Sequence, residues 1–315
     1  METNGEHIKS TSTNNINRKS TKGLTRRRVM LGGAGIVGVA TAIATQNAQA
    51  NTQNPPEPEA TLNPNGGFAG KVVLITGATS GIGAGAARAF AMAGATVHFC
   101  GRREILGKQV ADAIVAAGGK ATYQKADVRN EADVKAFVDE CVSRYGRIDI
   151  AFNNAGIDRP PAPLADTTSE VWDDTINTNL RGIFLAMKYE IPQMLKQNSG
   201  HIVNMSSLGG HRAFAGIAPY HASKFAIEAI TKVAAKDYAK QNIRVNAIAP
   251  GLVDTPMTER QVRDWNVTRE QLAANYAIDR ISTVEEQVRV VMFMCSPEAS
   301  YMTGAIVSVD GGGWG

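Results

Sequence analysis

Tyr220 and Lys224 are four residues apart in a segment that we expect to be helical, so their side chains should share one face of the helix. A free tyrosine has a pKa of about 10, too high for a base at neutral pH. A nearby ammonium favours the phenolate and lowers this pKa. The pair is therefore a candidate for acid/base catalysis, although the same spacing is also common in ordinary surface pairs.

Ser207 adds a third reactive group. It lies thirteen residues before Tyr220, at the end of an expected strand that reads Asn204-Met-Ser-Ser207. Its hydroxyl could hydrogen-bond a substrate oxygen and stabilise charge on that oxygen. Together, Ser207, Tyr220 and Lys224 predict proton transfer to or from an oxygen of the substrate.

A glycine-rich turn suits the binding of a dinucleotide. The run Thr76-Gly-Ala-Thr-Ser-Gly-Ile-Gly83 follows an apolar stretch and opens a segment of small residues. Its glycines allow a tight turn and a close approach of the backbone to a pyrophosphate, with amide donors at a helix N-terminus. Plain turns show the same spacing, but the place between a buried strand and a helix favours a nucleotide site. The candidates here are Gly77, Ser80, Gly81, Ile82 and Gly83.

The end of the second expected strand bears on the choice of nucleotide. Dinucleotide sites often place Asp or Glu there to bind the ribose, but this chain has Gly101, Arg102 and Arg103. Glycine offers no acceptor for a hydroxyl, whereas two guanidinium groups can bind a 2′-phosphate. We therefore expect NADP rather than NAD; the alternative is two solvated arginines at the start of a helix.

Strands and helices must alternate to position these residues. Short apolar runs predict strands at 71–76, 95–100, 121–126, 148–152, 201–205, 243–248 and 305–309. The segments between them predict helices at 81–93, 103–117, 131–145, 169–197, 220–240 and 284–295. This alternation implies an α/β fold with a doubly wound parallel sheet, the Rossmann fold, in a single domain. Ligands bind beyond the carboxyl ends of such strands, where we also place Asp127, Val128, Asn154, Ala155 and Gly156.

The first 50 residues differ in composition from the rest. Thr25-Arg-Arg-Arg28 precedes an uncharged stretch rich in Gly and Ala, which ends in Ala48-Gln-Ala50. This is the layout of a signal peptide, and the paired arginines resemble a twin-arginine signal. A retained membrane anchor and a tail without function are the alternatives, but the stretch is short of the roughly 20 apolar residues that span a bilayer. We expect a signal peptide at 1–50, a proline-rich linker at 51–67, a catalytic domain at 68–315, and a mature protein in the periplasm without membrane association.

The charge distribution argues against a nucleic-acid partner. The net charge is +4, but residues 1–50 hold seven basic and two acidic side chains, which leaves 26 basic and 27 acidic ones in the remainder. No basic surface for a phosphate backbone is therefore expected. The three cysteines and five histidines show no metal-ligand spacing, so we expect no metal site.

Taken together, residues 68–315 resemble the short-chain dehydrogenase/reductase family. The resemblance implies that Tyr220 donates a proton to a carbonyl and that Ser207 orients that carbonyl. It also implies that Lys224 lowers the tyrosine pKa and binds the nicotinamide ribose, and that Asn179 helps hold a water near the lysine. It adds Pro250, Gly251, Val253 and Thr255 to the cofactor-binding candidates, and it implies a homotetramer. The matching segments are Thr76-Gly77-x3-Gly81-x-Gly83, Asn153-Asn154-Ala155-Gly156, Asn177-Thr178-Asn179-Leu180, Ser207, Tyr220-His-Ala-Ser-Lys224, Pro250-Gly251 and Val309-Asp310-Gly311-Gly312.

The expected activity is NADP-dependent interconversion of a small carbonyl compound and a secondary alcohol. Two alternatives remain: a 3-oxoacyl-carrier-protein reductase and a non-catalytic dinucleotide-binding protein. Export would remove the carrier-protein partner, and four intact catalytic residues argue against a non-catalytic role. The substrate is not identified, because the segments expected to shape its site, at 158–164, after Ser207 and at 256–282, carry no substrate signature.

Overall fold

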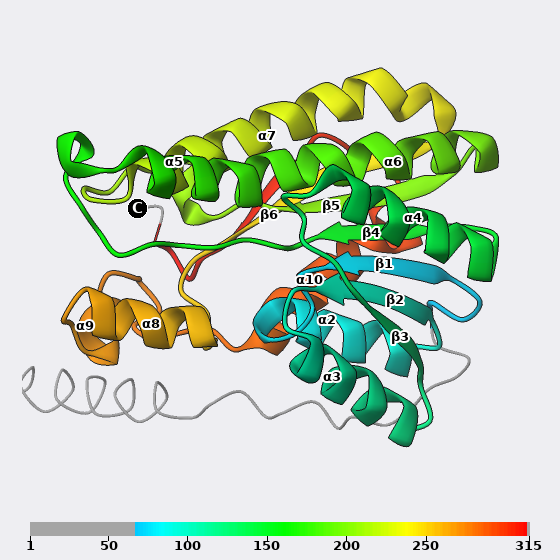
Figure 1. Cartoon of the computed structure of the whole chain (residues 1–315), viewed down its shortest axis with the longest axis horizontal. Coiled ribbons are helices and arrows are strands. Elements are labelled where there is room, and N and C mark those ends of the chain that lie inside the picture. The colour runs from blue at the N-terminus through cyan, green and yellow to red at the C-terminus, as the bar shows by residue number, and fades with distance from the viewer. Residues whose placement is uncertain (1–66, 314–315) are drawn as a thin grey trace, which may run out of the picture. The chain divides into compact units, whose positions relative to one another are not determined.

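The structure, a computed structural model, describes residues 67–313, so the predicted signal peptide and nearly all of the predicted linker lie outside it. Within these residues the strands form a seven-stranded sheet in the order β3-β2-β1-β4-β5-β6-β7, and every neighbouring pair is parallel. Figure 1 shows this doubly wound sheet, which confirms the predicted fold class. The strands are β1 (Val72–Thr76), β2 (Thr96–Gly101), β3 (Lys120–Lys125), β4 (Ile150–Asn153), β5 (Gly200–Met205), β6 (Ile243–Pro250) and β7 (Ile306–Val309).

Helices cover both faces of the sheet, in the layers that Figure 1 shows. Successive residues of β1 alternate between the two layers: Val73 and Ile75 join one core cluster, whereas Val72 and Leu74 join the other. All of β1 is buried, as its unbroken apolar run predicts. One layer holds α2 (Gly81–Met92), α3 (Glu104–Ala116) and α10 (Val284–Cys295), and the other holds α4 (Glu131–Tyr145), α6 (Gly182–Gln197) and α7 (Ala218–Tyr238).

The predicted helix at 169–197 has an irregular section in its first half. It consists of α5 (Ser169–Ile176), a π-helical turn (Asn177–Arg181) and α6. A π turn adds one residue to the helical ladder and is frequent at functional sites. The candidate Asn179 lies inside this turn, which periodicity alone did not predict.

Two short helices, α8 (Pro256–Asp264) and α9 (Arg269–Ala273), lie between the strand predicted at 243–248 and the helix predicted at 284–295, where the sequence predicts no regular element. Both begin at a threonine cap: the side chain of Thr255 accepts a hydrogen bond from the Thr258 amide, and Thr268 forms a capping box with Gln271. No helix of residues 67–313 is long and apolar enough to cross a membrane.

The order of the strands reverses between β1 and β4, which pair with each other although β2 and β3 come between them in sequence. The glycine turn follows β1, and Asn154 follows β4, so both reach this switch point. Ligands of doubly wound sheets bind there. The fold therefore brings the two halves of the predicted cofactor site together.

Candidate active site

Tyr220 and Lys224 project from the first half of α7, which begins at Ala218. The Lys224 ammonium lies 5.4 Å from the centre of the Tyr220 ring, so the two side chains share one face as predicted. Lys224 is 3% exposed, and its Nζ donates a hydrogen bond of 2.8 Å to the Met205 carbonyl at the end of β5. The buried Lys224 amine is thus fixed beside the tyrosine by the end of β5.

The pKa values of this pair differ from the expectation. Burial raises the pKa of Tyr220 to about 12, although its hydrogen bond with Ser207 acts in the opposite direction. Burial also lowers the pKa of Lys224 to about 7. The loss of solvation therefore outweighs the Ser207 hydrogen bond, and Tyr220 is held in its protonated form.

Ser207 follows β5 in extended backbone and caps a short helical turn, where its Oγ accepts a hydrogen bond of 3.1 Å from the Gly209 amide. The next residues are held by side chains that the sequence analysis did not single out. His221 Nδ1 lies 2.8 Å from the Gly209 carbonyl, and the Phe214 amide donates to His221 Nε2 at 2.8 Å. His221 thus fixes the loop that carries Ser207.

Glu228 is a second residue that the sequence analysis missed. Its buried carboxylate accepts a hydrogen bond of 2.7 Å from Ser206 and lies 3.1 Å from His211 Nδ1. Glu228 is four residues after Lys224, so the helical spacing that singled out Tyr220 and Lys224 extends to it. The carboxylate anchors both ends of the loop after β5.

Asn179 is fully buried, and its amide brackets the backbone of Ile157: Oδ1 accepts from the Ile157 amide at 2.8 Å, and Nδ2 donates to the Ile157 carbonyl at 2.9 Å. Nδ2 also lies 3.2 Å from the Ser223 hydroxyl on α7. A Cβ on Gly156 would lie 3.4 Å from Asn179 Oδ1 and 3.8 Å from Lys224 Nζ. Asn179, Gly156 and Lys224 therefore meet at one place, as the catalytic assignment requires.

The glycine turn packs directly against the residues that follow β4. Gly77 has a φ of +73°, and a Cβ there would lie 2.6 Å from the Ala155 Cα, so only glycine fits. Asn154 Nδ2 donates to the carbonyls of Thr76 and Gly77, at 3.1 Å each, and a Cβ on Gly83 would lie 2.5 Å from this same atom. The Asn154 side chain thus fixes the conformation of the glycine turn through its carbonyl groups.

Arg103 is fixed beside this turn. Its guanidinium donates to Thr79 Oγ1 at 2.7 Å and to Ser80 Oγ at 2.6 Å, next to the first residue of α2. The Ser80 side chain does not cap α2. A cation, a hydroxyl and amides of the first helical turn are the donors that suit a phosphate, so the residues present fit a dinucleotide. Arg102 beside it is exposed.

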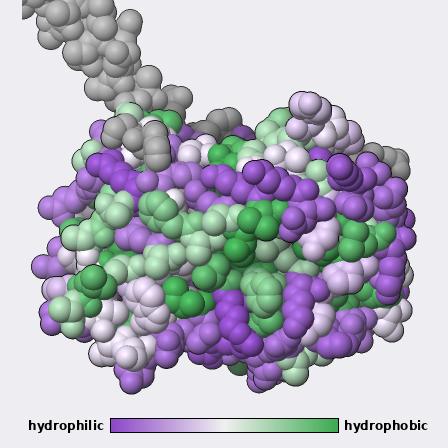
Figure 2. Space-filling model, turned by 90° about the horizontal axis from the view of Figure 1, so that it is seen from above, coloured by the Kyte–Doolittle hydropathy of each residue, from purple (hydrophilic) through white to green (hydrophobic). Residues whose placement is uncertain are grey.

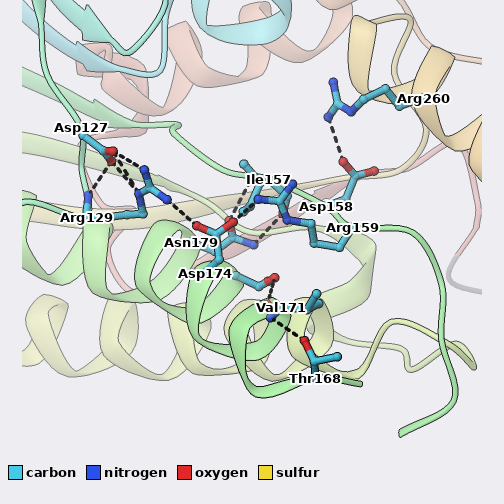
Figure 3. A network of polar contacts seen from close by, with 11 residues as sticks. Asp127, Arg129, Ile157, Asp158, Arg159, Thr168, Val171, Asp174, Asn179 and Arg260 are labelled. Atoms are coloured by element: carbon cyan, nitrogen blue, oxygen red, sulfur yellow. Dashed lines mark hydrogen bonds and ion pairs between the residues drawn. The ribbon is translucent and has the colours of Figure 1, made fainter. Parts of the chain in front are cut away.

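Asp127 and Val128 follow β3. Val128 is buried, and the Asp127 carboxylate accepts hydrogen bonds from Arg129 Nε at 3.0 Å and Nη2 at 2.5 Å. Arg129 Nη1 donates in turn to Asp174 on α5 at 2.6 Å, and Asp174 also pairs with Arg159 (Figure 3). The end of β3 is thereby linked through charges to the loop after β4, a network that separate motifs did not predict.

The segment after β6 returns to the glycine turn. A Cβ on Gly81 would lie 3.3 Å from Thr255 Cγ2, and Val253 forms a bridge with Ser282. A Cβ on Gly251, which follows Pro250, would lie 2.8 Å from the Tyr276 ring. The charge of Tyr276 also contributes to raising the pKa of Tyr220. The cover segment, residues 256–282, and Thr255 just before it therefore lie close to the glycine turn and to Tyr220.

Residues 67–313 hold no cluster of side chains that could bind a metal ion. Cys100, Cys141 and Cys295 are buried and unpaired, and burial raises the pKa of each thiol to about 12. Burial therefore holds these three thiols in their unreactive protonated form.

Known proteins resemble this chain in sequence and in fold. Residues 77–313 match the family model described as enoyl-(acyl carrier protein) reductase. The 3-oxoacyl-[acyl-carrier-protein] reductase FabG of Thermotoga maritima is 42% identical over 247 residues, covering 77% of this chain and 97% of that protein. The 3beta-hydroxysteroid dehydrogenase of Mediterraneibacter gnavus is 38% identical over 265 residues, covering 78% and 96%.

Among solved structures, levodione reductase superposes with a TM-score of 0.76 at 34% identity, covering 78% of this chain and 98% of the other. The homologues are dehydrogenases and reductases that act on alcohol or carbonyl groups. This chain accordingly belongs to the short-chain dehydrogenase/reductase family, whose members are oxidoreductases that bind NAD(P).

Proposed function

We propose that this enzyme transfers a hydride between NADP(H) and a small molecule that carries a carbonyl or a secondary alcohol. The observation that carries the proposal is the placement of the buried Lys224 Nζ 5.4 Å from the centre of the Tyr220 ring, with the Ser207 hydroxyl hydrogen-bonded to the same tyrosine. Such a group can pass a proton to and from one substrate oxygen.

The proton donor in the reductive direction is Tyr220. Because burial raises its pKa to about 12, the side chain keeps its proton at neutral pH and can donate it to the carbonyl oxygen. Ser207 hydrogen-bonds the same oxygen and holds it in place. In the oxidative direction Tyr220 must accept a proton as the phenolate. The charged form of Lys224, whose pKa burial lowers to about 7, favours that phenolate. The nicotinamide ring, when bound, supplies or accepts the hydride.

Asn179 and Lys224 complete the site. The Asn179 side chain hydrogen-bonds the backbone of Ile157 and the hydroxyl of Ser223. The contact with Ser223 holds the π turn against α7. In the proposed mechanism this turn helps hold a water near Lys224, through which the tyrosine regains its proton. The four residues Asn179, Ser207, Tyr220 and Lys224 then act as one proton-transfer unit.

NADP is the proposed nucleotide because Arg102 and Arg103 stand where an acidic residue would bind a ribose hydroxyl. Gly101 adds support: a Cβ there would lie 2.6 Å from Thr79 Cγ2, so the position has no room for a carboxylate while Thr79 stays in place. Thr79 in turn holds Arg103. Selection for the 2′-phosphate of NADP thus involves both the end of β2 and the glycine turn.

A reductase of 3-oxoacyl carrier-protein thioesters is the second candidate, and the 42% identity to the Thermotoga maritima enzyme favours it. A substrate panel separates the two. Purified enzyme is mixed with NADPH and, in separate reactions, with ketones, sugars, quinones, ketosteroids and an acetoacetyl thioester, and NADPH absorbance is followed. Turnover of a small ketone that exceeds turnover of the thioester supports the first proposal, and the reverse order supports the second. Tyr220→Phe is the control for turnover at this site.

The proposal extends to the compartment. The paired Arg26 and Arg27 before an uncharged stretch support export by the twin-arginine route, which carries folded proteins, so that NADP is bound before export. The mature chain then begins near Asn51 and lies in the periplasm outside the membrane. It retains its cofactor, and a second substrate returns that cofactor to its starting redox state. Changing both arginines to lysine and fractionating cells tests this. An unchanged distribution would mean a cytoplasmic enzyme with a dispensable tail.

A homotetramer is the proposed assembly. Apolar side chains gather on the face formed by α5, α6 and α7 (Figure 2), where Trp172, Phe184, Phe225 and Val233 are between 39% and 57% exposed. Exposed apolar surface of this kind marks protein interfaces, and a second copy of the chain offers a matching face.

A further inference from the structure

Arg260 lies on α8, in the cover segment, and no motif singled it out. Its Nη2 donates a hydrogen bond of 2.9 Å to Asp158 Oδ1, and its Nη1 donates to the Pro256 carbonyl at 3.1 Å. Figure 3 shows the side chain reaching from α8 to Asp158 in the loop after β4. The ion pair therefore connects the cover segment to a loop of the active site.

The same guanidinium lies among other cations. Burial lowers the pKa of Arg103, and the charges of Arg260 and Arg102 lower it further, as like charges do when they are close together. Arg103 itself is held at the start of α2 by Thr79 and Ser80. An anion placed between these guanidinium groups would offset their repulsion.

The backbone brings two helix N-termini to this place. Thr255 caps α8, and its Cγ2 would lie 3.3 Å from a Cβ on Gly81, the first residue of α2. The amide ends of both helices carry partial positive charge. Two helix ends therefore meet next to the glycine turn, with Arg103 held at the start of α2 and Arg260 on the first turns of α8, and a diphosphate is the anion that suits these donors.

Asp158 occupies the opposite end of the ion pair, and its carboxylate is 11% exposed. Its two neighbours in the loop are fixed elsewhere, since Ile157 is bonded to Asn179 and Arg159 pairs with Asp174. The charge of Asp158 also acts on Tyr220. A change in the Asp158 contact with α8 therefore changes the electrostatic surroundings of Tyr220.

We propose that Arg260 binds the diphosphate of the dinucleotide, and that Asp158 is a competing anion which holds the guanidinium until the diphosphate displaces it. The inference rests on the proposed function, since it needs a dinucleotide in this site. It gives the two partners of one ion pair opposite effects: Arg260 favours nucleotide binding, and Asp158 opposes it. Because the diphosphate is common to both nucleotides, the effects are the same for NADH and NADPH.

The test measures dissociation constants of NADH and NADPH by calorimetry at fixed ionic strength for the wild type, Arg260→Ala, Asp158→Asn and the double variant. Arg260→Ala should weaken both nucleotides by about tenfold, the effect of losing one charge-assisted contact. Asp158→Asn should tighten both by a few fold, because a neutral amide competes less. In the double variant the Asp158 change should have no further effect, since its target is gone. Arg263→Ala is the matched control: Arg263 is also on α8 but pairs with Asp264.

A purely structural ion pair gives a different pattern, in which Arg260→Ala and Asp158→Asn both weaken binding because both loosen the cover segment. That pattern, or no change in either variant, would overturn the proposal. An effect confined to NADPH would also overturn it, because the 2′-phosphate would then be the partner. Failure of the wild type to bind either nucleotide would refute the proposed function instead.

Discussion

At the scale of single residues, Tyr220 carries the clearest prediction. Tyr220→Phe removes the hydroxyl and keeps the ring, so NADPH binding should stay near the wild-type value while reduction slows by about a hundredfold to ten-thousandfold, the range for a lost general acid. Binding is measured by calorimetry and turnover by NADPH absorbance. Lys224→Ala should damage both quantities. Wild-type turnover in Tyr220→Phe would show that another group transfers the proton.

Cofactor choice is predicted at Arg102. Its guanidinium is exposed next to Arg103, so Arg102→Ala should lower the affinity for NADPH by about tenfold and leave the affinity for NADH unchanged. Arg88→Ala, at an exposed position on α2, is the control. Equal losses for both nucleotides would contradict the 2′-phosphate assignment.

Gly101→Asp, the obvious route to an NAD enzyme, meets an obstacle that the sequence does not reveal. The new Cβ would lie 2.6 Å from Thr79 Cγ2, and Thr79 holds Arg103. The substitution should therefore be combined with a smaller residue at position 79. Motifs supplied the candidate residues of this site, but only the structure shows which of them support each other.

At the scale of elements, the sequence predicted those strands and helices whose apolar residues repeat regularly. Buried strands such as β1 and the small-residue helix α2 were predicted to within a few residues. The π turn at Asn179 was not, because a single added residue leaves the apolar period on either side intact. Helices α8 and α9 were missed because their capping threonines precede segments dominated by polar side chains.

Glu190 on α6 was also not foreseen, although it is 1% exposed. Its Oε2 accepts a hydrogen bond of 3.1 Å from Asn153 at the end of β4, while its Oε1 has no hydrogen-bond partner among the described residues. Burial raises the pKa of this carboxyl to about 7. The folded protein therefore retains a proton at Glu190 over a pH range in which the unfolded chain has lost it.

A pH-dependent stability difference follows from that burial. Because the folded pKa is raised, the contribution of Glu190 is fully present below its ordinary pKa of 4.5 and is lost as the pH rises through about 7. Glu190→Gln should therefore raise the free energy of unfolding by about 1 kcal/mol at pH 5 and by roughly 3 kcal/mol at pH 8. Denaturant titration at both pH values measures this. Glu285→Gln, at an exposed position on α10, should show no such difference; a flat profile for Glu190→Gln would contradict the assignment.

At the scale of the whole molecule, the exposed face of α5, α6 and α7 predicts the assembly. Phe184 is 52% exposed and Phe225 is 47% exposed, and a lysine at either position would be buried without a partner in an interface. Phe184→Lys and Phe225→Lys should lower the mass measured by analytical ultracentrifugation. Val115→Lys, on α3 in the opposite layer, is the control with a similarly exposed apolar residue. A wild-type mass equal to that of one chain would refute the tetramer.

The burial of Cys100, Cys141 and Cys295 has a consequence for the redox chemistry of the chain. Once folded, the protein offers none of these thiols to an oxidant, so a thiol reagent such as Ellman's should label none of them until denaturant is added. A chain that crossed a membrane unfolded would instead present three reactive sulfurs to an oxidising compartment, where they could join in wrong pairs. Folding before any membrane crossing would thus protect the three thiols from oxidation. The rate at which a thiol reagent labels the folded protein then measures how often the domain opens.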